Sequence, residues 1–117
     1  DVMVMENMFG DILSDQGGGI LGSLGLMPSA CVGPTKSYYE PSHGSAPDIA
    51  GKGIANPIGM ILSIGMMLDH SLGRPDLAAK VDGAVTTALD DGFATPDIGG
   101  PHGSQTFTDA VIERLNS

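Results

Sequence analysis

The stretch EPSHGSAPDIAGKGIANP, residues 40–57, is the part of this chain that says most about its fold. Its small side chains predict a loop whose backbone N–H groups can come close to a ligand. Asn56 is a favoured N-cap and Pro57 suits a first helical position, so we expect a helix to follow. Loop and helix start together favour the phosphates and sugar of a nucleotide. A solvated turn is the alternative, because Gly51-x-Gly53 alone is not a dinucleotide-binding fingerprint.

Hydrophobic periodicity predicts two helices directly after this loop. The first is nearly all apolar over 58–68 and is expected to stop at Gly73, which makes it a core helix too short to span a bilayer. The second follows Pro75 and is expected to end at Gly92. Its apolar stripe consists of Leu77, Val81, Ala84, Val85, Ala88 and Leu89.

Two more helices are expected near the ends of the chain. One begins near Met8 and must be held by packing, because each glycine of Gly17–Gly19 costs about 1 kcal/mol relative to alanine in a helix. The other begins at about Thr106, with Asp109 completing an imperfect capping box. Its apolar face consists of Phe107, Ala110, Val111 and Leu115.

Strands are expected to be few and short. The apolar run Val2–Met5 predicts a buried strand, residues 22–34 suit short extended pieces joined by turns, and Ser37–Tyr39 is a second strand candidate. Few strands together with several amphipathic or buried helices predict an α/β fold in layers.

The composition limits the classes of partner. Five Lys and Arg against fourteen Asp and Glu give a net charge of −9 over 117 residues, which argues against nucleic acid or an anionic membrane as a partner. A hydrophobic content of 41% predicts a globular chain rather than a disordered one. The one cysteine, Cys31, has no intrachain disulfide partner and is expected to be a small buried hydrophobe. We expect Met60, Met66 and Met67 in the core, and His70 and His102 at the surface.

Asp11 and Asp15 form a candidate metal site. On a helix, residues four apart share one face, so the two carboxylates can converge. Two hard oxygen ligands without nearby His or Cys suit Mg²⁺ or Mn²⁺ rather than zinc. A solvated helix face is the alternative, although both acids stand among apolar residues and repel each other without a cation.

Asp48 is a candidate for cofactor selection. A carboxylate at this place in the loop can accept hydrogen bonds from ribose hydroxyls and repel a 2′-phosphate. That arrangement favours NAD over NADP.

Three motifs carry a family resemblance that extends over essentially the whole chain, including the tail Thr95–Leu115. NMFGDILSD at 7–15, GSLGLMPSA at 22–30 and the stretch at 40–57 closely resemble the C-terminal part of the isopropylmalate dehydrogenases. These belong to the β-decarboxylating 2-hydroxyacid dehydrogenases, together with isocitrate, homoisocitrate, tartrate and D-malate enzymes. Departures from the family pattern are Gln16-Gly-Gly-Gly19 and Ser42.

The resemblance implies part of a two-domain isopropylmalate dehydrogenase-like fold. Residues 1–25 would end the dimer-forming substrate domain, and residues 26–117 would form the C-terminal part of the NAD-binding terminal domain. Metal-binding roles fall on Asp11 and Asp15. The implied residues around the adenosine half of NAD are His43, Gly44, Ser45, Ala46, Pro47, Asp48 and Asn56, with Glu40 and Ile49 beside them.

The resemblance also implies a reaction. The complete enzyme would use NAD and Mg²⁺ or Mn²⁺ to oxidise and decarboxylate 3-isopropylmalate to 2-oxoisocaproate in leucine biosynthesis, as a homodimer in the cytoplasm or an organelle. Pro28-Ser-Ala30 favours this substrate over isocitrate and homoisocitrate. The substrate-binding arginines, the catalytic tyrosine and lysine and a further metal-binding aspartate are expected upstream of residue 1, so no catalytic residue is assigned to this chain. A non-catalytic fragment acting as an acidic interaction module is the alternative, which the intact mass of the gene product distinguishes.

Overall fold

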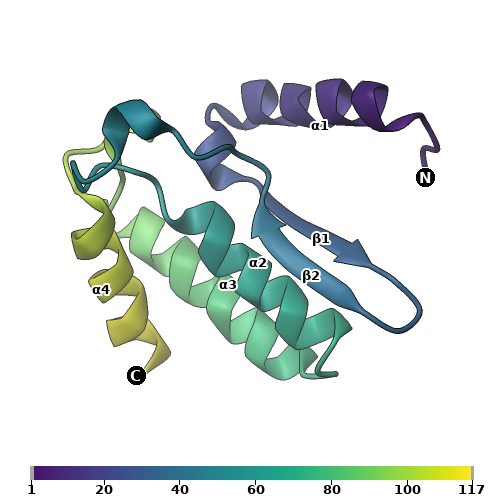
Figure 1. Cartoon of the computed structure of the whole chain (residues 1–117). Helices are drawn as coiled ribbons and strands as arrows, with labels where there is room; N and C mark the ends of the chain where they lie inside the picture. The colour runs from purple at the N-terminus through teal and green to yellow at the C-terminus, as the bar shows by residue number, and fades with distance from the viewer. Residues whose placement is uncertain (1, 117) are drawn as a thin grey trace.

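The computed structural model describes residues 2–116, which form four α-helices, three short 3-10 helices and one β-hairpin (Figure 1). In chain order the elements are α1 (Asn7–Leu21), η1 (Leu24–Leu26), β1 (Pro28–Val32), β2 (Ser37–Pro41), η2 (Pro47–Ile49), α2 (Ile58–His70), α3 (Pro75–Asp90), η3 (Pro96–Ile98) and α4 (Ser104–Leu115). This mixture of helices and strands agrees with the predicted α/β class. The end residues of the two expected domain segments, 1 and 117, lie outside the described residues.

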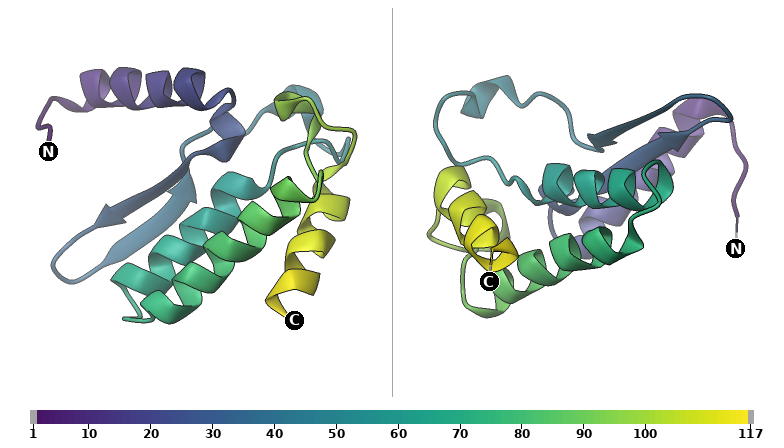
Figure 2. Two further views of the ribbon diagram at one scale, coloured as in Figure 1. Left: turned by 180° about the vertical axis from the view of Figure 1, so that it is seen from behind. Right: turned by 90° about the horizontal axis from the view of Figure 1, so that it is seen from below.

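The hairpin β1–β2 packs on α2, and α3 and α4 follow behind it (Figures 1 and 2). The two strands are antiparallel, with Val32 opposite Ser37 and Pro28 opposite Pro41. The buried hydroxyl of Ser63 on α2 joins helix to hairpin: it accepts from the backbone N–H of Ser29 at 3.3 Å and lies 3.0 Å from the carbonyl oxygen of Glu40.

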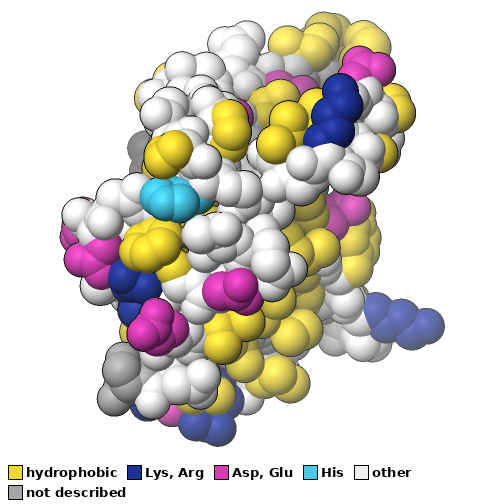
Figure 3. Space-filling view, turned by 90° about the vertical axis from the view of Figure 1, so that its left-hand side faces the viewer, with side chains coloured by type: hydrophobic (Ala, Val, Ile, Leu, Met, Phe, Trp, Pro, Cys, Tyr) yellow, Lys and Arg dark blue, Asp and Glu magenta, His cyan; other side chains and the backbone are white. Residues whose placement is uncertain are grey.

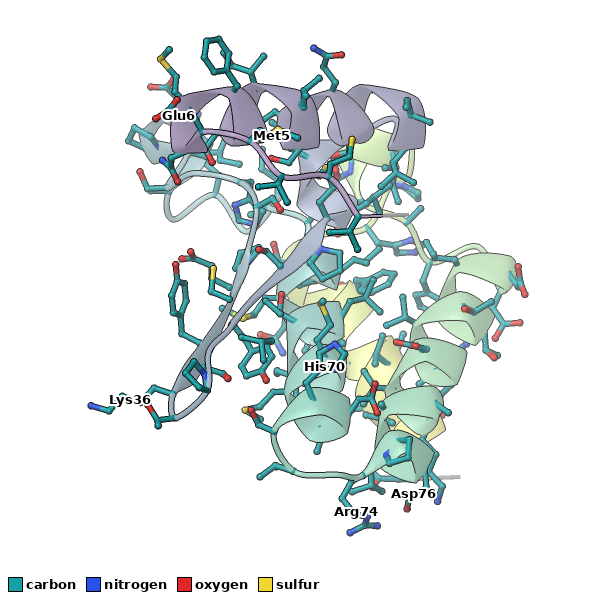
Figure 4. All side chains as sticks on the ribbon, turned by 90° about the vertical axis from the view of Figure 1, so that its right-hand side faces the viewer. Met5, Glu6, Lys36, His70, Arg74 and Asp76 are labelled. Atoms are coloured by element: carbon teal, nitrogen blue, oxygen red, sulfur yellow. The ribbon has the colours of Figure 1, made fainter. Side chains whose placement is uncertain are left out.

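The core lies between α2, α3 and α4. Its buried side chains are Ile58, Ala84, Val85, Ala88, Phe107, Ala110 and Val111. The apolar stripes predicted for the last two helices therefore face the core, although Leu115 is exposed. At the start of α3 the Arg74 guanidinium donates to both carboxylate oxygens of Asp76 (Figure 4), and this hydrogen bonding lowers the pKa of Asp76 to about 2.

Helix α1 lies away from this core and packs chiefly on η1 (Figure 1). A Cβ atom on Gly18 would lie 2.5 Å from Cδ2 of Leu24, so the small residue permits the close approach. Gly22 ends the helix with φ of 96°. Gly18 is the one buried residue of α1, so among the described residues packing reaches the glycine-rich helix mainly at this end, and its support by packing stays a prediction.

The predicted buried strand Val2–Met5 is wrong. These residues have no regular structure and are exposed, and Val4 reaches 94%. In the part of the chain that the structure describes, the hairpin is the one sheet, so no neighbouring strand pairs with this run. Met5 instead contacts the first turns of α1, where Glu6 accepts from the backbone N–H of Met8 (Figure 4).

Other corrections concern single side chains. Cys31 is exposed rather than buried, because the outer part of β1 extends beyond the helices, and Met60 is 47% exposed on the outer side of α2. His102 is half-buried and packs on the Phe93 ring, with centroids 5.1 Å apart, so it is not the surface residue expected. His70 is exposed at the end of α2, as expected (Figure 4).

Two helix starts differ by one or two residues from expectation. Helix α4 begins at Ser104 after Gly103, so the capping box of Thr106 and Asp109 does not form, and Asp109 accepts from Gln105 instead. Helix α2 begins at Ile58 rather than at the proline before it. Among residues 2–116, no helix is long and apolar enough to cross a membrane.

Residues 1–117 expressed alone are expected to self-associate or to be only partly ordered. Phe9, Ile12 and Ile20 on α1 are 56%, 52% and 88% exposed, and exposed apolar surface of this extent favours association. Sedimentation velocity and circular dichroism measure the outcome. Phe9→Ser with Ile12→Ser should reduce association, whereas the control Leu72→Ser, at an exposed leucine outside α1, should not. A sharp cooperative melt of a monomeric wild-type chain would contradict the expectation.

Candidate functional site

A pocket of about 790 Å³ opens where η1, the loop before α2 and η3 meet. Its lining residues are Ser23, Leu24, Gly25, His43, Gly44, Ser45, Ala46, Ile49, Ala50, Gly51, Gly53, Ile54, Ala55, Asn56 and Asp97. These segments lie at the end of the molecule where η2 and η3 come together (Figures 1 and 2). Small side chains dominate the wall, so the backbone of the loop is accessible to a ligand, as the sequence predicts.

The N-terminal end of α4 fixes the loop. The backbone N–H of Ser104 donates to the carbonyl oxygen of Gly53 at 2.8 Å, and the Ser104 hydroxyl donates to the carbonyl oxygen of Ala55. A Cβ atom on Gly103 would lie 2.6 Å from that Gly53 oxygen, so only glycine permits this approach. The base of the loop is therefore fixed, while most of residues 44–55 are exposed to solvent. The cofactor role of the loop stays a prediction.

Asn56 is buried between the loop and α2 and makes two hydrogen bonds. Its Oδ1 accepts from the backbone N–H of Ile58 at 3.0 Å, which satisfies an N–H in the first turn of α2. Its Nδ2 donates to Oδ2 of Asp97 at 3.0 Å. The predicted helix-start residue thus also links α2 to η3.

Asp97 is a pocket residue that the sequence analysis missed. Its carboxylate accepts from three side chains: the Ser23 hydroxyl at 2.5 Å, the Thr95 hydroxyl at 2.6 Å and the Asn56 amide. Partial burial raises the pKa of Asp97, but the hydrogen bonds from Ser23, Thr95 and Asn56 outweigh it, so the pKa lies below its ordinary value. The group is therefore an anion at neutral pH.

No sequence signal separates Asp97 from similar residues. Pro-Asp pairs occur three times, at 47–48, 75–76 and 96–97, and each stands at the start of a helical turn. Only the packing of distant segments shows which of the three aspartates accepts hydrogen bonds from residues far away in the chain.

Most of the predicted cofactor residues are brought together at the pocket. His43, Gly44, Ser45, Ala46, Ile49 and Asn56 line it. Glu40, Pro47 and Asp48 are not among the lining residues. The carboxylate of Asp48 is exposed at the start of η2, and Glu40 is exposed on β2 while its carbonyl oxygen faces Ser63.

The candidate metal pair lies on α1, outside this pocket. Asp11 and Asp15 are exposed, and within residues 2–116 neither carboxylate makes a hydrogen bond or ion pair. Two uncommitted carboxylates fit the oxygen ligands that Mg²⁺ and Mn²⁺ prefer. The described residues contain no cluster of three or more His, Cys, Asp or Glu that would complete a site. The metal role of this pair therefore remains a prediction.

Comparison with known proteins decides the relationship. The family model described as isocitrate/isopropylmalate dehydrogenase matches residues 1–115. The chain belongs to this family. A family member, the 3-isopropylmalate dehydrogenase of Deinococcus radiodurans, is 55% identical over 117 residues, which are all of this chain and 33% of that protein. The isocitrate/homoisocitrate dehydrogenase of Thermus thermophilus is 54% identical, over all of this chain and 35% of that protein.

A solved structure of the same family supports the fold. The isocitrate dehydrogenase of Methylococcus capsulatus matches with a TM-score of 0.90 and 46% identity over 95% of this chain and 33% of that one. The predicted α/β, isopropylmalate dehydrogenase-like fold is thus confirmed. The chain spans about a third of the length of these relatives. The domain boundary near residue 25 remains a prediction.

Proposed function

We propose that this chain is the nucleotide-binding C-terminal part of an NAD-dependent dehydrogenase that oxidises and decarboxylates 3-isopropylmalate to 2-oxoisocaproate. The observation that carries the proposal is the pocket at which His43 to Ala46 converge with Asn56. These residues belong to the motif that resembles the family's adenosine-binding loop. The 55% identity to the Deinococcus radiodurans 3-isopropylmalate dehydrogenase supports the substrate.

In this proposal the loop binds and orients the adenosine end of the cofactor. Its glycine and alanine residues leave backbone N–H groups open to the ligand, and the contact of Ser104 with Gly53 keeps the loop in place. Binding energy from this remote part of the cofactor helps to hold its reactive ring against the substrate. The groups that exchange protons with the substrate would come from outside this chain.

Asp11 and Asp15 on α1 would hold a divalent cation, outside the nucleotide pocket. Their spacing on α1 and their uncommitted carboxylates support this role. When bound, Mg²⁺ or Mn²⁺ acts as a Lewis acid that stabilises negative charge on the oxygen atoms of a 2-hydroxy acid.

The apolar side chains exposed on α1 support a second proposal, that the complete protein is a homodimer joined in part through this helix.

A related substrate is the second candidate. The Thermus thermophilus isocitrate/homoisocitrate dehydrogenase is 54% identical to the chain, nearly as similar as the isopropylmalate relative. Isocitrate and homoisocitrate are also 2-hydroxy acids, so the same cofactor loop and metal pair would serve their oxidation.

The complete protein is expected to turn over 3-isopropylmalate with a higher kcat/KM than isocitrate, homoisocitrate, D-malate or tartrate. The assay follows NADH absorbance and carbon dioxide release in the presence of Mn²⁺. A higher kcat/KM with isocitrate or homoisocitrate would select the second candidate. Absence of NAD reduction with all five acids would contradict a dehydrogenase function.

Replacing Asp11 or Asp15 by alanine in the complete protein should raise the Mn²⁺ concentration for half-maximal activity by about tenfold or more, since altered metal ligation has effects of this size. The dissociation constant of NAD, measured by fluorescence titration, should stay nearly unchanged because α1 does not line the pocket. Asp90→Ala, at an exposed position on α3, is the matched control. The assignment fails if the Mn²⁺ requirement is the same in all variants.

The cofactor is expected to be NAD rather than NADP. Asp48 does not line the pocket, but it directly precedes the lining residue Ile49 on η2. A 2′-phosphate at this edge of the pocket would meet its carboxylate as a like charge, so kcat/KM with NAD should exceed that with NADP by at least about tenfold. Asp48→Asn should narrow this ratio, while Asp109→Asn, at an exposed position on α4, should not. Equal kcat/KM values for the two cofactors in the wild-type protein would show that Asp48 does not face the ribose.

A further inference from the structure

We propose that Asp97 is a positioning residue for the nucleotide pocket, which fixes the amide of Asn56 and the turn at Ser23–Gly25 in the arrangement that receives the cofactor. The inference rests on the proposed nucleotide-binding function. It concerns a residue to which the family resemblance assigns no role.

The first argument is the convergence of donors on one carboxylate. Oδ2 of Asp97 accepts from both Ser23 and Asn56, and Oδ1 accepts from Thr95. Ser23 is 74 residues and Asn56 is 41 residues away in the chain, so a single side chain connects two otherwise separate walls of the pocket. Charge-assisted hydrogen bonds of this kind are about twice as strong as neutral ones.

The second argument is the orientation of the Asn56 amide. Its Oδ1 accepts from the backbone N–H of Ile58, and its Nδ2 donates to Asp97. Rotating the amide by half a turn would place its oxygen against the carboxylate and its NH₂ against the N–H of Ile58, which would lose both bonds. Asp97 and the first turn of α2 therefore select one orientation, in which one N–H of Nδ2 remains for a ligand.

The third argument is the closeness of the opposite wall. The Ser23 hydroxyl donates to Asp97 and accepts from the backbone N–H of Gly25 at 3.1 Å. A Cβ atom on Gly25 would lie 2.7 Å from Cβ of Asn56 and 3.2 Å from Oδ2 of Asp97. The turn thus sits against Asn56 with no room for a side chain, and a small displacement of either wall changes the shape of the pocket.

Asp97 acts on the pocket rather than on the core. It lines the pocket and is exposed, whereas the core between α2, α3 and α4 consists of buried apolar side chains. Its loss should therefore weaken cofactor binding without slowing the chemical step, because the reacting groups lie elsewhere. A merely structural role would lower the active fraction and kcat together.

The test uses Asp97→Ala, Asp97→Asn and the control Asp90→Ala in the complete protein. In Asp97→Ala the KM for NAD should rise by about tenfold, the effect of losing a charge-assisted hydrogen bond, while kcat and the KM for the hydroxy acid stay close to wild type. Asparagine keeps one acceptor oxygen at this position, so Asp97→Asn should restore most of the affinity. Asn56→Ala combined with Asp97→Ala should raise the KM for NAD by less than the product of the two single effects.

Hydrogen exchange separates failure of this inference from failure of the proposed function. The N–H groups of Gly25 and Ile58 are bonded to Ser23 and Asn56, so their exchange should accelerate in Asp97→Ala and not in Asp90→Ala. If the wild-type protein does not use NAD but exchange still accelerates in Asp97→Ala, the positioning role is supported and NAD is rejected as the cofactor. Unchanged exchange, or an unchanged KM for NAD in an NAD-using enzyme, would overturn the positioning role. If Asp97→Ala does not fold, Ser23→Ala removes one donor to Asp97, and the readouts are then the KM for NAD and exchange at Ile58, because Ser23 is itself the acceptor for the N–H of Gly25.

Discussion

The close packing of α2 on η1 and the hairpin is the constraint from which the rest of the structure follows. A Cβ atom on Gly59 would lie 2.9 Å from the carbonyl oxygen of Met27 and 3.0 Å from that of Gly25, so the helix can approach this segment only without a side chain there. One turn further along, the hydroxyl of Ser63 accepts from the backbone N–H of Ser29 on β1. It also lies within hydrogen-bond distance of the carbonyl oxygens of Glu40 on β2 and of Gly59 in its own helix. Since α3 packs on the other side of α2, this single contact joins the hairpin to the helical core.

Fixing α2 in this way also fixes the place of the pocket. The first turn of α2 holds the Asn56 amide, and Asp97 then connects that amide to the turn at Ser23. The part of the loop directly before Asn56 is held by α4 through Ser104. The pocket is thus a junction of chain segments that are distant in sequence. Figure 3 shows this side of the molecule, where acidic groups lie among hydrophobic side chains. The carboxylate of Asp97 is exposed, but it accepts from donors on both sides of this junction and so orders them, which is the basis for assigning it a positioning role.

Helix α1 illustrates how a sequence pattern can predict an element and still not its environment. The helix forms where expected, and Gly18 lies so close to the side chain of Leu24 that a Cβ atom would not fit there. The apolar run Val2–Met5 before it was expected to be a buried strand, but burial of a strand depends on a neighbour that hydrogen-bonds to it. The same reasoning applies to Cys31: its residue type favours burial, whereas the length of the hairpin beyond the helices leaves it exposed.

The sequence alone determined the local features of this protein: the nearly all-apolar helix α2, the helix α3 with its apolar stripe, the loop of small residues ending at Asn56, and the motifs that place the chain in its family. These are set by periodicity, capping and side-chain size, which act over a few residues. Only the tertiary structure decided which loop residues line the pocket and that Asp48 is not one of them. It also showed that Asp97 accepts hydrogen bonds from Ser23 and Asn56. Hydrogen bonds between residues 41 and 74 positions apart depend on how whole elements pack, and no local pattern records that packing.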